Sequence, residues 1–245
     1  MATIVTAFVT KINDINFRTI EKYIELGKKL LSQPLPTICF LEKYIYDAYF
    51  SDCLELFPKT DFHIFERHEN YLMEHTSKMM NFKVESDNPT KDTIGYMFTQ
   101  CHKTEWVRIA IEKNPFGTSD FVWIDFGIFH MIRADSVTNF PLYLEKMTRK
   151  TYDTIRIASC IDPREACKSD IYHKISWFFA GSVFGGSSLN LLKFAEKMKS
   201  FCLDMIATRQ HLMWEINIWY LLYKEEPGLF DPYSADHNIT ILGNY

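Results

Sequence analysis

The residue best placed to do chemistry in this chain is an acid at the end of an apolar run. Residues 121–130 read FVWIDFGIFH, so Asp125 is followed at once by Phe126 and Gly127. A strand that ends in an acid and a glycine puts a carboxylate at the carboxyl edge of a sheet, where open α/β sheets bind ligands. A divalent cation held there could assist the departure of a diphosphate as a Lewis acid. The alternative is that Asp125 only caps the turn that follows.

A segment of small residues lies further along the chain. Residues 177–190 read WFFAGSVFGGSSLN, in which Gly181 interrupts an apolar run and Gly185 and Gly186 are expected to open a helix. Small residues leave room for a sugar ring, and N–H groups at a helix start can meet an anion or a hydroxyl. The alternative is tight packing of helix against strand without a ligand. Together with Asp125, this segment suggests a nucleotide-sugar site.

Three further polar residues are candidates for the same chemistry. Glu215 stands in an apolar helical stretch, where a carboxylate is either part of a solvated stripe or a paired functional group. Lys103, on the helix expected before the Asp125 strand, can reach a phosphate or be an ordinary surface lysine. His237 follows Asp236 in a loop-like tail and is either a metal ligand or simply exposed to solvent.

The D-F-G spelling at Asp125 also occurs in protein kinases and small-molecule phosphotransferases. Those enzymes need a catalytic aspartate and then an asparagine upstream of D-F-G. Residues 102–120 read HKTEWVRIAIEKNPFGTSD and contain neither H-R-D nor H-G-D. No G-x-G-x-x-G stands near the start and no A-P-E follows, so the sequence disfavours a phosphotransferase.

Strands and helices alternate along the chain and predict an α/β fold. Residues 3–10 are rich in β-branched residues, and an amphipathic helix over 17–31 and a strand over 37–41 follow. Such a strand–helix–strand unit favours a parallel sheet with a right-handed crossover. The other expected elements are a short strand at 61–66, a loop at 84–93, a helix at 93–113, strands at 154–159 and 177–184, helices at 187–199 and 201–223, and a short β segment in the tail.

The bulk composition limits the class of protein. A chain of 245 residues with 47% hydrophobic and 24% charged residues suits one large globular domain. The net charge of -4 argues against a general nucleic-acid-binding surface. The six cysteines form no C-x-x-C pair, which argues against a zinc site and favours buried free thiols.

The start of the chain lacks the basic and apolar regions of a signal peptide, and no uncharged run is long enough to span a bilayer. We therefore expect a soluble, cytoplasmic protein without a transmembrane segment. The many aromatic residues leave room for a homodimer, although no heptad seam is visible.

Five segments occur in an order that is typical of one family. They are TIVTAFVT, PTICFLE, HKTEWVRIAIEKNPFGTSDFVWIDFGI, WFFAGSVFGGSSLNLLKFAEKM, and MWEINIWYLL followed by LFDPY. This order resembles the HtrL/YibB-type family of glycosyltransferases of bacteria and large DNA viruses over nearly the whole chain. The resemblance implies a GT-A-like fold: a single α/β domain over residues 1–245, with a mixed, mostly parallel central sheet flanked by helices. It also implies that residues 1–130 mainly bind the nucleotide and residues 131–245 mainly bind the acceptor.

For the donor, the resemblance implies roles at the ends of the first strand and of the Asp125 strand. Thr6, Ala7 and Phe8 would line the nucleoside, and Lys103 would face the donor. Asp125, with Gly127 beside it, would hold metal and diphosphate.

For the reacting sugar and the acceptor, the resemblance implies a second group of residues. Glu215 would be the carboxylate near the anomeric carbon, as a base, as a stabiliser of positive charge or as a ligand of the acceptor. The pocket for sugar and acceptor would be shaped by Gly181, Gly185 and Gly186.

The chain departs from the metal-binding D-x-D motif of GT-A enzymes, because Gly127 stands where the second acid is expected. Either Asp125 binds Mn²⁺ or Mg²⁺ with another ligand, such as His237 or Asp236, or metal dependence is weak.

The sequence therefore predicts a metal-assisted glycosyltransferase that moves a sugar from a nucleoside diphosphate sugar to a hydroxyl acceptor on a glycan. UDP is the default base of the donor. The missing second acid motivates the alternative, a catalytically degenerate GT-A-like module that binds a glycan or a protein.

Overall fold

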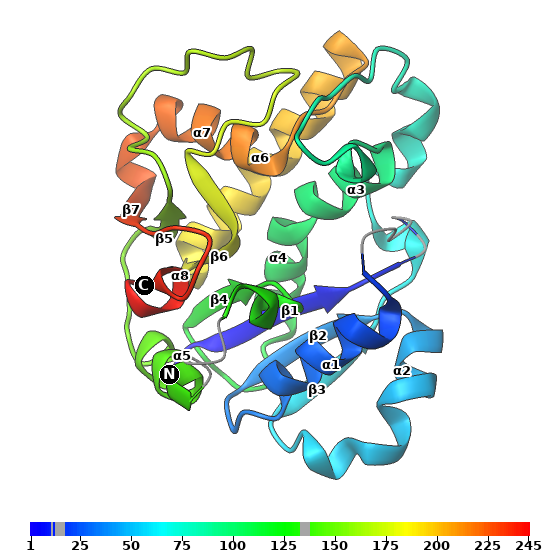
Figure 1. Ribbon diagram of the computed structural model, residues 1–245, viewed down its shortest axis with the longest axis vertical. Coiled ribbons are helices and arrows are strands. Elements are labelled where there is room, and N and C mark those ends of the chain that lie inside the picture. The colour runs from blue at the N-terminus through cyan, green and yellow to red at the C-terminus, as the bar shows by residue number, and fades with distance from the viewer. Residues whose placement is uncertain (11, 13–17, 133–137) are drawn as a thin grey trace.

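One mixed sheet runs through the molecule and positions the rest of the fold (Figure 1). The computed structural model describes residues 1–10, 12, 18–132 and 138–245. The strands are β1 (Thr3–Phe8), β2 (Thr37–Leu41), β3 (Thr60–Ile64), β4 (Asp120–Ile124), β5 (Ile155–Ser159), β6 (Phe179–Ser187) and β7 (Phe230–Ser234). Over these described ranges they form a 7-stranded sheet in the order β3-β2-β1-β4-β6-β5-β7.

The sheet is parallel except at β6. β1 pairs in parallel with β2 and β4, and β2 pairs in parallel with β3. β6 runs antiparallel to both β4 and β5, and β5 pairs in parallel with β7. From β1 the chain builds β2 and β3 on one side and then places β4 on the other side. The carboxyl ends of β1 and β4 therefore flank a topological switch point, where open α/β sheets bind ligands.

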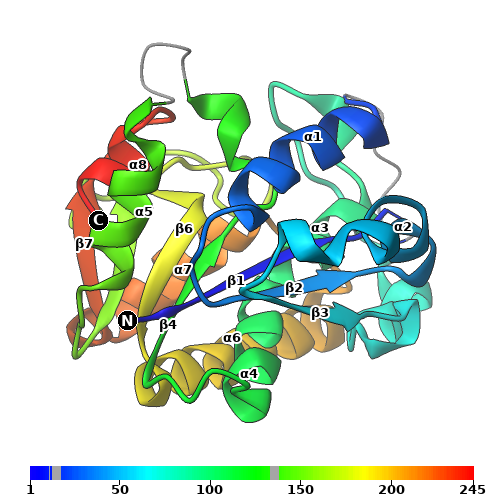
Figure 2. The same cartoon turned by 90° about the horizontal axis from the view of Figure 1, so that it is seen from below.

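Helices cover both faces of the sheet (Figure 2). One face carries α4 (Lys103–Lys113), α6 (Ser188–Arg209) and α7 (Glu215–Glu225), and the other carries α1 (Ile20–Leu31), α5 (Phe140–Thr148) and α8 (Thr240–Gly243). Successive residues of β4 alternate between these faces: Phe121 and Trp123 pack on the α4 side, and Val122 and Ile124 on the α1 side. Because both faces are covered, the central strands are continuous apolar runs.

Shorter elements complete the edge of the sheet where β1 and β4 end. α2 (Lys43–Tyr49) follows β2, and α3 (Ile94–Cys101) leads directly into α4. Two 3₁₀ turns matter for the site, Pro89–Lys91 before α3 and Ile128–Met131 after β4.

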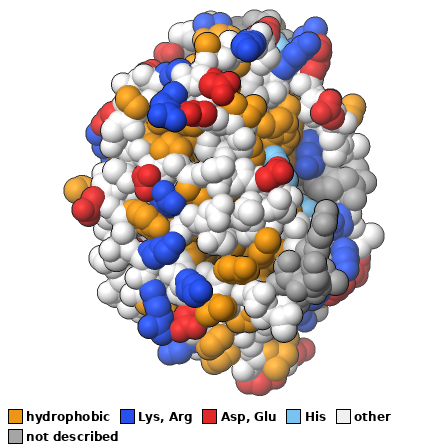
Figure 3. Space-filling model, turned by 60° about the vertical axis from the view of Figure 1, so that its left-hand side comes forward, with side chains coloured by type: hydrophobic (Ala, Val, Ile, Leu, Met, Phe, Trp, Pro, Cys, Tyr) orange, Lys and Arg blue, Asp and Glu red, His pale blue; other side chains and the backbone are white. Residues whose placement is uncertain are grey.

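The surface charge, the helices and the cysteines bear on expectations drawn from the sequence. Basic side chains lie beside acidic and apolar ones on the face shown in Figure 3, so this face carries mixed charge. None of the helices in the described ranges is both long and apolar enough to cross a membrane. All six cysteines are unbridged, in line with the expectation of free thiols, and Cys39, Cys101 and Cys202 are buried.

The predicted fold class, a single α/β domain with a mixed, mostly parallel central sheet between helices, is confirmed. The strand predicted at 37–41 is β2, and the strand predicted at 61–66 is β3, one to two residues earlier. The start of the helix predicted at 17–31 lies partly outside the described residues. α1 is described from Ile20, with the Thr19 side chain accepting a hydrogen bond from the Lys22 N–H as its N-cap.

Two predicted helix boundaries are wrong. The break expected near residue 200 lies inside α6, which continues to Arg209. Gln210 ends that helix in the left-handed region, with φ 53°, a position that glycine or asparagine usually takes. The sequence therefore gave no breaker signal there, and Glu215 is the first residue of α7 instead of a mid-helix residue. The helix predicted at 93–113 is likewise two helices, α3 and α4, that meet at His102.

The position predicted for Gly185 and Gly186 is also wrong. They were expected after the strand, at the opening of a helix, but β6 runs on to Ser187 and both glycines pair with β4. Residues 179–187 form one strand, in which Gly185 and Gly186 let neighbouring atoms pack closely against the backbone. A Cβ on Gly185 would lie 2.3 Å from Tyr245 Oη, and one on Gly186 would lie 2.4 Å from the Thr154 carbonyl oxygen.

The contact between α1 and the turn after β4 depends on Gly27. A Cβ there would lie 2.0 Å from the nearest ring atom of Phe126, whose ring stacks on Phe8 with centroids 5.0 Å apart. The absence of a side chain at Gly27 therefore lets α1 hold Phe126 beside the carboxyl ends of β1 and β4.

We expect Gly27→Ala to destabilise the protein, although alanine normally favours a helix. Overpacking of a buried contact costs about 1–3 kcal/mol. Gly228→Ala is the control, because no atom of the described residues lies within 4 Å of a Cβ at that position. Thermal unfolding should show a lower midpoint for Gly27→Ala only, and equal midpoints for the two variants would contradict this packing.

Candidate functional site

A cavity of about 420 Å³ opens at the carboxyl ends of β1 and β4, within the size range of small-molecule sites. Ala7 and Phe8 line it from the end of β1, and Asp125 and Gly127 from the turn after β4. Other lining residues come from the start of α1, the turn before α3, and helices α3 and α4. The cavity therefore lies at the switch point of the sheet.

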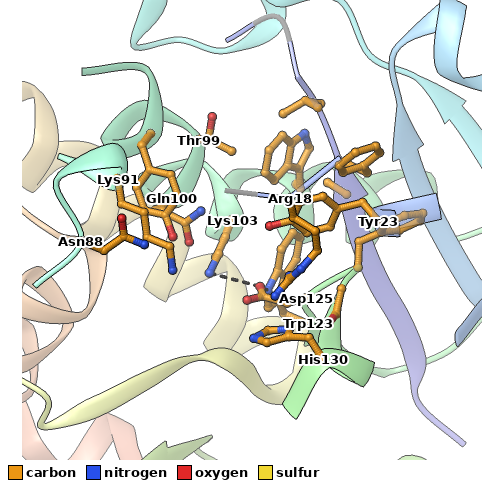
Figure 4. A pocket seen from close by; sticks show the side chains of 17 residues that line it. Arg18, Tyr23, Asn88, Lys91, Thr99, Gln100, Lys103, Trp123, Asp125 and His130 are labelled. Carbon is orange, nitrogen blue, oxygen red and sulfur yellow. Dashed lines mark hydrogen bonds and ion pairs between the residues drawn. The ribbon is translucent and has the colours of Figure 1, made fainter. Parts of the chain in front are cut away.

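The centre of the site is the ammonium group of Lys103 (Figure 4). Its Nζ lies 3.1 Å from Asp125 Oδ1 and 3.2 Å from Glu215 Oε1, and it donates to the Gly181 carbonyl oxygen at 2.9 Å. A lysine ammonium has three N–H donors, so these three acceptors satisfy it fully. The lysine side chain is 4% exposed, which makes the group a buried cation between two carboxylates.

These carboxylates keep Lys103 charged. Burial alone would lower the pKa of Lys103, but the charges and hydrogen bonds of Asp125 and Glu215 outweigh it and raise the pKa above its ordinary value. The ammonium is therefore protonated at neutral pH.

Asp125 is the more exposed of the two acids, with 33% of its side chain accessible. Its Oδ1 also accepts a hydrogen bond of 2.8 Å from Trp123 Nε1, and the Trp123 ring stacks on Trp106 at 5.7 Å. Lys103 and Trp123 thus fix the orientation of a carboxylate that still faces the cavity.

Glu215 is buried, and its side chain is 4% exposed. It starts α7, and its Oε1 lies 2.3 Å from where a Cβ on Gly181 would be, so Gly181 makes room for this carboxylate. Its Oε2 has no hydrogen-bond partner within the described structure. Glu215 is not among the residues that line the cavity, and it touches the site through Lys103.

Two further cations line the cavity. Lys91 comes from the turn before α3, and Arg18 precedes α1, with its guanidinium 5.0 Å from the centre of the Tyr23 ring. Burial lowers the pKa of Lys91, and the carboxylates of Asp125 and Glu215 counter part of this effect. Figure 4 shows Lys91 and Arg18 among the side chains that line the cavity with Lys103 and Asp125.

His130 also lines the cavity but does not add a charge. Burial lowers the pKa of this imidazole below its usual value, against the opposing effect of the hydrogen bond between His130 and the Gly127 carbonyl oxygen. It is therefore neutral at pH 7.

An aromatic wall closes the side of the cavity near α1. Phe8 packs between Phe126 and Tyr23, with its ring centroid 5.2 Å from that of Tyr23. Burial raises the pKa of Tyr23 to about 12, against the opposing effect of Arg18, so its hydroxyl stays protonated. This wall offers a neutral aromatic surface beside the cations.

The sequence-predicted residues fall into two groups. The structure brings together Ala7, Phe8, Lys103, Asp125 and Gly127 at the cavity. Thr6 is fully buried and Gly181 packs on Glu215, so neither lines it. Gly185 and Gly186 pair with the amino-terminal half of β4, towards the opposite edge of the sheet from Asp125.

His237 lies in the tail beyond β7. Its ring is 4.6 Å from that of Trp177, and its Nδ1 is 3.9 Å from Cys160 Sγ. It is not among the residues that line the cavity with Asp125.

The described residues contain no closed site for a divalent cation built from protein ligands alone. A protein metal site gathers several carboxylate, imidazole or thiolate ligands around one point. No group of three or more His, Cys, Asp or Glu side chains in the described part of the chain could do so. Asp125 and Glu215 share one ammonium, that of Lys103.

Sequence reasoning missed much of the cavity wall. The polypeptide at 84–93 read only as a polar loop, yet it supplies Asn88 and Lys91. Gln100, from α3, was read only as part of a helix, and Arg18 and Tyr23 stood at or inside a predicted amphipathic helix. The available signal was the helix start after β1, since the helix that follows the first strand begins near the switch point.

Comparison with family models gives no match, and no curated protein matches the chain. Solved structures similar to it include the apo form of mouse xyloside xylosyltransferase 1, with a TM-score of 0.49 and 10% identity over 95% of this chain and 84% of that chain. HddC from Yersinia pseudotuberculosis has a TM-score of 0.40 and 11% identity over 96% of this chain and 90% of that chain. 4-Diphosphocytidyl-2C-methyl-D-erythritol synthase from Anaerococcus prevotii has a TM-score of 0.44 and 8% identity over 97% and 88%, respectively. Likeness at this level carries no argument about activity, so function has to be argued from the site.

The buried ion pairs give a first test of the site. We expect Lys103→Met to lower the free energy of unfolding by about 3–5 kcal/mol, because it leaves Glu215 buried without its cation. Adding Glu215→Gln should restore part of that loss. Lys113→Met, on the exposed end of the same helix, is the control. Denaturant unfolding measures all four proteins, and a stability of Lys103→Met equal to that of the control would contradict the buried triad.

His102, where α3 meets α4, gives a second test. Among the described residues neither ring nitrogen finds a hydrogen-bond partner, and burial, aided by Lys199 and Arg108, lowers the pKa of His102 from 6.5 to about 3. Below pH 6.5 the unfolded chain binds a proton here that the folded chain does not, so stability falls as pH drops from 6.5 towards 3. At pH 5 the loss amounts to about 2 kcal/mol.

We expect His102→Leu to lose this part of the acid sensitivity. As the pH falls from 7 to about 5, the free energy of unfolding of this variant should increase relative to that of the wild type. Denaturant titrations at each pH measure this difference, and parallel pH profiles would show that His102 is not a buried neutral imidazole.

Proposed function

We propose that the protein is a GT-A-type glycosyltransferase that moves a sugar from a nucleoside diphosphate sugar to a hydroxyl acceptor. The observation that supports this best is the cavity at the switch point. It combines an aromatic wall, cations and one partly exposed carboxylate. A nucleoside diphosphate sugar has the matching parts: a flat base, an anionic diphosphate and sugar hydroxyls.

The donor would lie across the ends of β1 and β4. Phe8 and Tyr23 offer the base and ribose an aromatic surface, and UDP remains the default nucleotide. Lys91 and Arg18 face the space where the diphosphate would sit. Asp125 would accept a hydrogen bond from a hydroxyl of the donor, because its carboxylate reaches the cavity while Lys103 holds it.

In the transfer step, the bond between the anomeric carbon and the diphosphate oxygen breaks, and the electron pair leaves with the diphosphate. The acceptor oxygen forms the new bond to that carbon, and its proton passes to the Asp125 carboxylate. Preorganised cations stabilise the charge on the leaving diphosphate. Asp125 is the catalytic carboxylate of this proposal, and Glu215 is a positioning residue that acts through Lys103.

The two cavities are lined by different parts of the chain, which supports the same proposal. Every described residue that lines the cavity lies between Ala7 and His130, which suits a nucleotide-binding half over residues 1–130. A second cavity, of about 580 Å³, lies at the carboxyl ends of β5 and β7. It is lined by polar residues that include Ser159, Asp162 and Arg164, and we assign the acceptor to this half, residues 131–245.

We expect Asp125→Asn to lower donor turnover by about 100-fold or more, because a neutral amide cannot act as a base. The assay measures release of nucleoside diphosphate from a panel of nucleotide sugars. Asp120→Asn is the matched control, since Asp120 begins the same strand at its opposite end.

Two outcomes decide between the proposal and its alternative. Turnover by wild type that is lost in Asp125→Asn, with a folded variant, supports the transferase. Wild-type protein that binds a nucleotide but turns over no donor would favour a degenerate binding module, and full activity of Asp125→Asn would overturn the role of Asp125.

A further inference from the structure

The five tryptophans of the chain differ in their exposure to solvent. Trp177 is 40% exposed, whereas the other four are buried. An indole face in water is a surface on which a ligand can bury an apolar face of its own. Resting on the proposed function, we propose that Trp177 is the platform on which a sugar ring of a glycan acceptor stacks, beside the second cavity.

Trp177 lies at the edge of the sheet where both cavities open. β6 lies between β4 and β5 and runs antiparallel to both, so its amino end is at the same edge as their carboxyl ends. Trp177 comes two residues before β6 begins at Phe179. The donor cavity lies on the β4 side of this position, and the second cavity lies on the β5 side. A glycan that reaches from the second cavity towards Asp125 therefore crosses the start of β6.

A series of contacts joins Trp177 to the second cavity. The ring of His237 lies 4.6 Å from that of Trp177, at an interplanar angle of 90°. His237 Nδ1 lies 3.9 Å from Cys160 Sγ, and Cys160 lines the cavity. Burial raises the pKa of the Cys160 thiol to about 11, so this part of the wall is uncharged at pH 7. The platform and the cavity are thus parts of one surface.

The residues on both sides of Trp177 are held in place by α7. The Ser176 N–H donates a hydrogen bond of 2.8 Å to Oδ1 of Asn217, which is fully buried. The ring of Phe178 stacks on that of Tyr220, with centroids 4.0 Å apart. Because its neighbours are fixed, Trp177 is positioned before a ligand arrives, and less conformational entropy is lost on binding.

The second cavity has a lining that suits a sugar. Tyr223 and Tyr233 contribute aromatic rings, and Asp162 and Arg164 contribute planar polar groups. These two polar groups form an ion pair but stay accessible, with 39% of the Asp162 side chain and 81% of the Arg164 side chain exposed. A sugar ring has apolar C–H faces, which match aromatic rings, and hydroxyl groups, which donate to a carboxylate and accept from a guanidinium.

The exposed apolar area around Trp177 is small, which favours a sugar over a protein partner. A tryptophan side chain has up to about 250 Å² of surface, so 40% exposure leaves about 100 Å². Ile161, whose N–H donates to the Phe178 carbonyl oxygen, adds a second exposed apolar side chain. A stable protein interface buries about 800 Å² on each partner. The platform therefore suits one ring of a glycan.

The first test is an array of oligosaccharides with gluco, galacto, manno and xylo configurations, probed with the full chain. We expect wild type to retain a subset of them, and calorimetric titration with a retained oligosaccharide to show binding at least about tenfold weaker for Trp177→Ala. Trp177→Phe keeps an aromatic ring and should recover most of the affinity. Leu189→Ala is the matched control, because Leu189 is 75% exposed and follows the opposite end of β6.

Three results would contradict the platform. They are a wild type that retains no oligosaccharide, equal affinities of Trp177→Ala and Leu189→Ala, and a wild-type dimer that Trp177→Ala converts to a monomer in light scattering. The last result would mean that a second copy of the chain covers the ring.

Fluorescence quenching tests whether the ring itself is covered. Because the other tryptophans are buried, acrylamide should quench mainly the emission of Trp177. The retained oligosaccharide should reduce this quenching in wild type and have no effect on it in Trp177→Phe. Quenching of wild type that stays the same with the oligosaccharide bound would rule out stacking on Trp177.

Turnover of nucleotide sugars by wild type, measured separately, distinguishes this inference from the proposed function. Turnover without oligosaccharide binding would remove the platform and leave the transferase in place. Oligosaccharide binding that depends on Trp177, without turnover of any donor, would remove the transferase and leave a sugar-binding platform.

Discussion

The ammonium of Lys103, held between Asp125 and Glu215, is the interaction on which the site depends. It joins four parts of the fold: α4, the turn after β4, the start of α7 and the backbone of β6. A buried ammonium without carboxylates would favour its neutral form, and a buried carboxylate without a cation would do the same. Each of the three groups therefore requires the other two. The fold brings the three groups together because α4 and α7 cover the same face of the sheet. Along β4 alternate residues, Phe121 and Trp123, point to that face, and Asp125 is the next residue in this alternation.

This constraint also shapes what the cavity can bind. Because Lys103 offsets one of the two negative charges and holds the Asp125 carboxylate, Asp125 can face the ligand as an oriented acceptor. Lys91 and Arg18 bring positive charge to the cavity, and Phe8 and Tyr23 form its aromatic wall. The position at the switch point explains why these groups meet, since segments that follow β1 and β4 converge there.

Several strands, and the position of Asp125 after one of them, could be predicted from the sequence because short local patterns of residues determine them. The β-branched run at 3–10, the strand at 37–41 and the acid after the apolar run at 121–124 each gave a correct element or position. Lys103 and Glu215 were candidates by residue type, but their pairing depends on two helices distant in sequence, which no local pattern reveals. The left-handed Gln210 gave no breaker signal, so the start of α7 was missed. The glycines of β6 were read as space for a ligand, whereas that space is filled by Glu215, Tyr245 and the backbone at Thr154.

The most direct test of the central claim is to locate the nucleotide on the protein. Hydrogen–deuterium exchange of the full chain, with and without saturating UDP, reports on each segment separately. We predict slower exchange in the segments 7–9, 88–92 and 125–130, which contribute residues to the cavity lining. It predicts no change at residues 159–164 and 232–234, around the second cavity. Protection confined to that second cavity would contradict a donor site at the ends of β1 and β4.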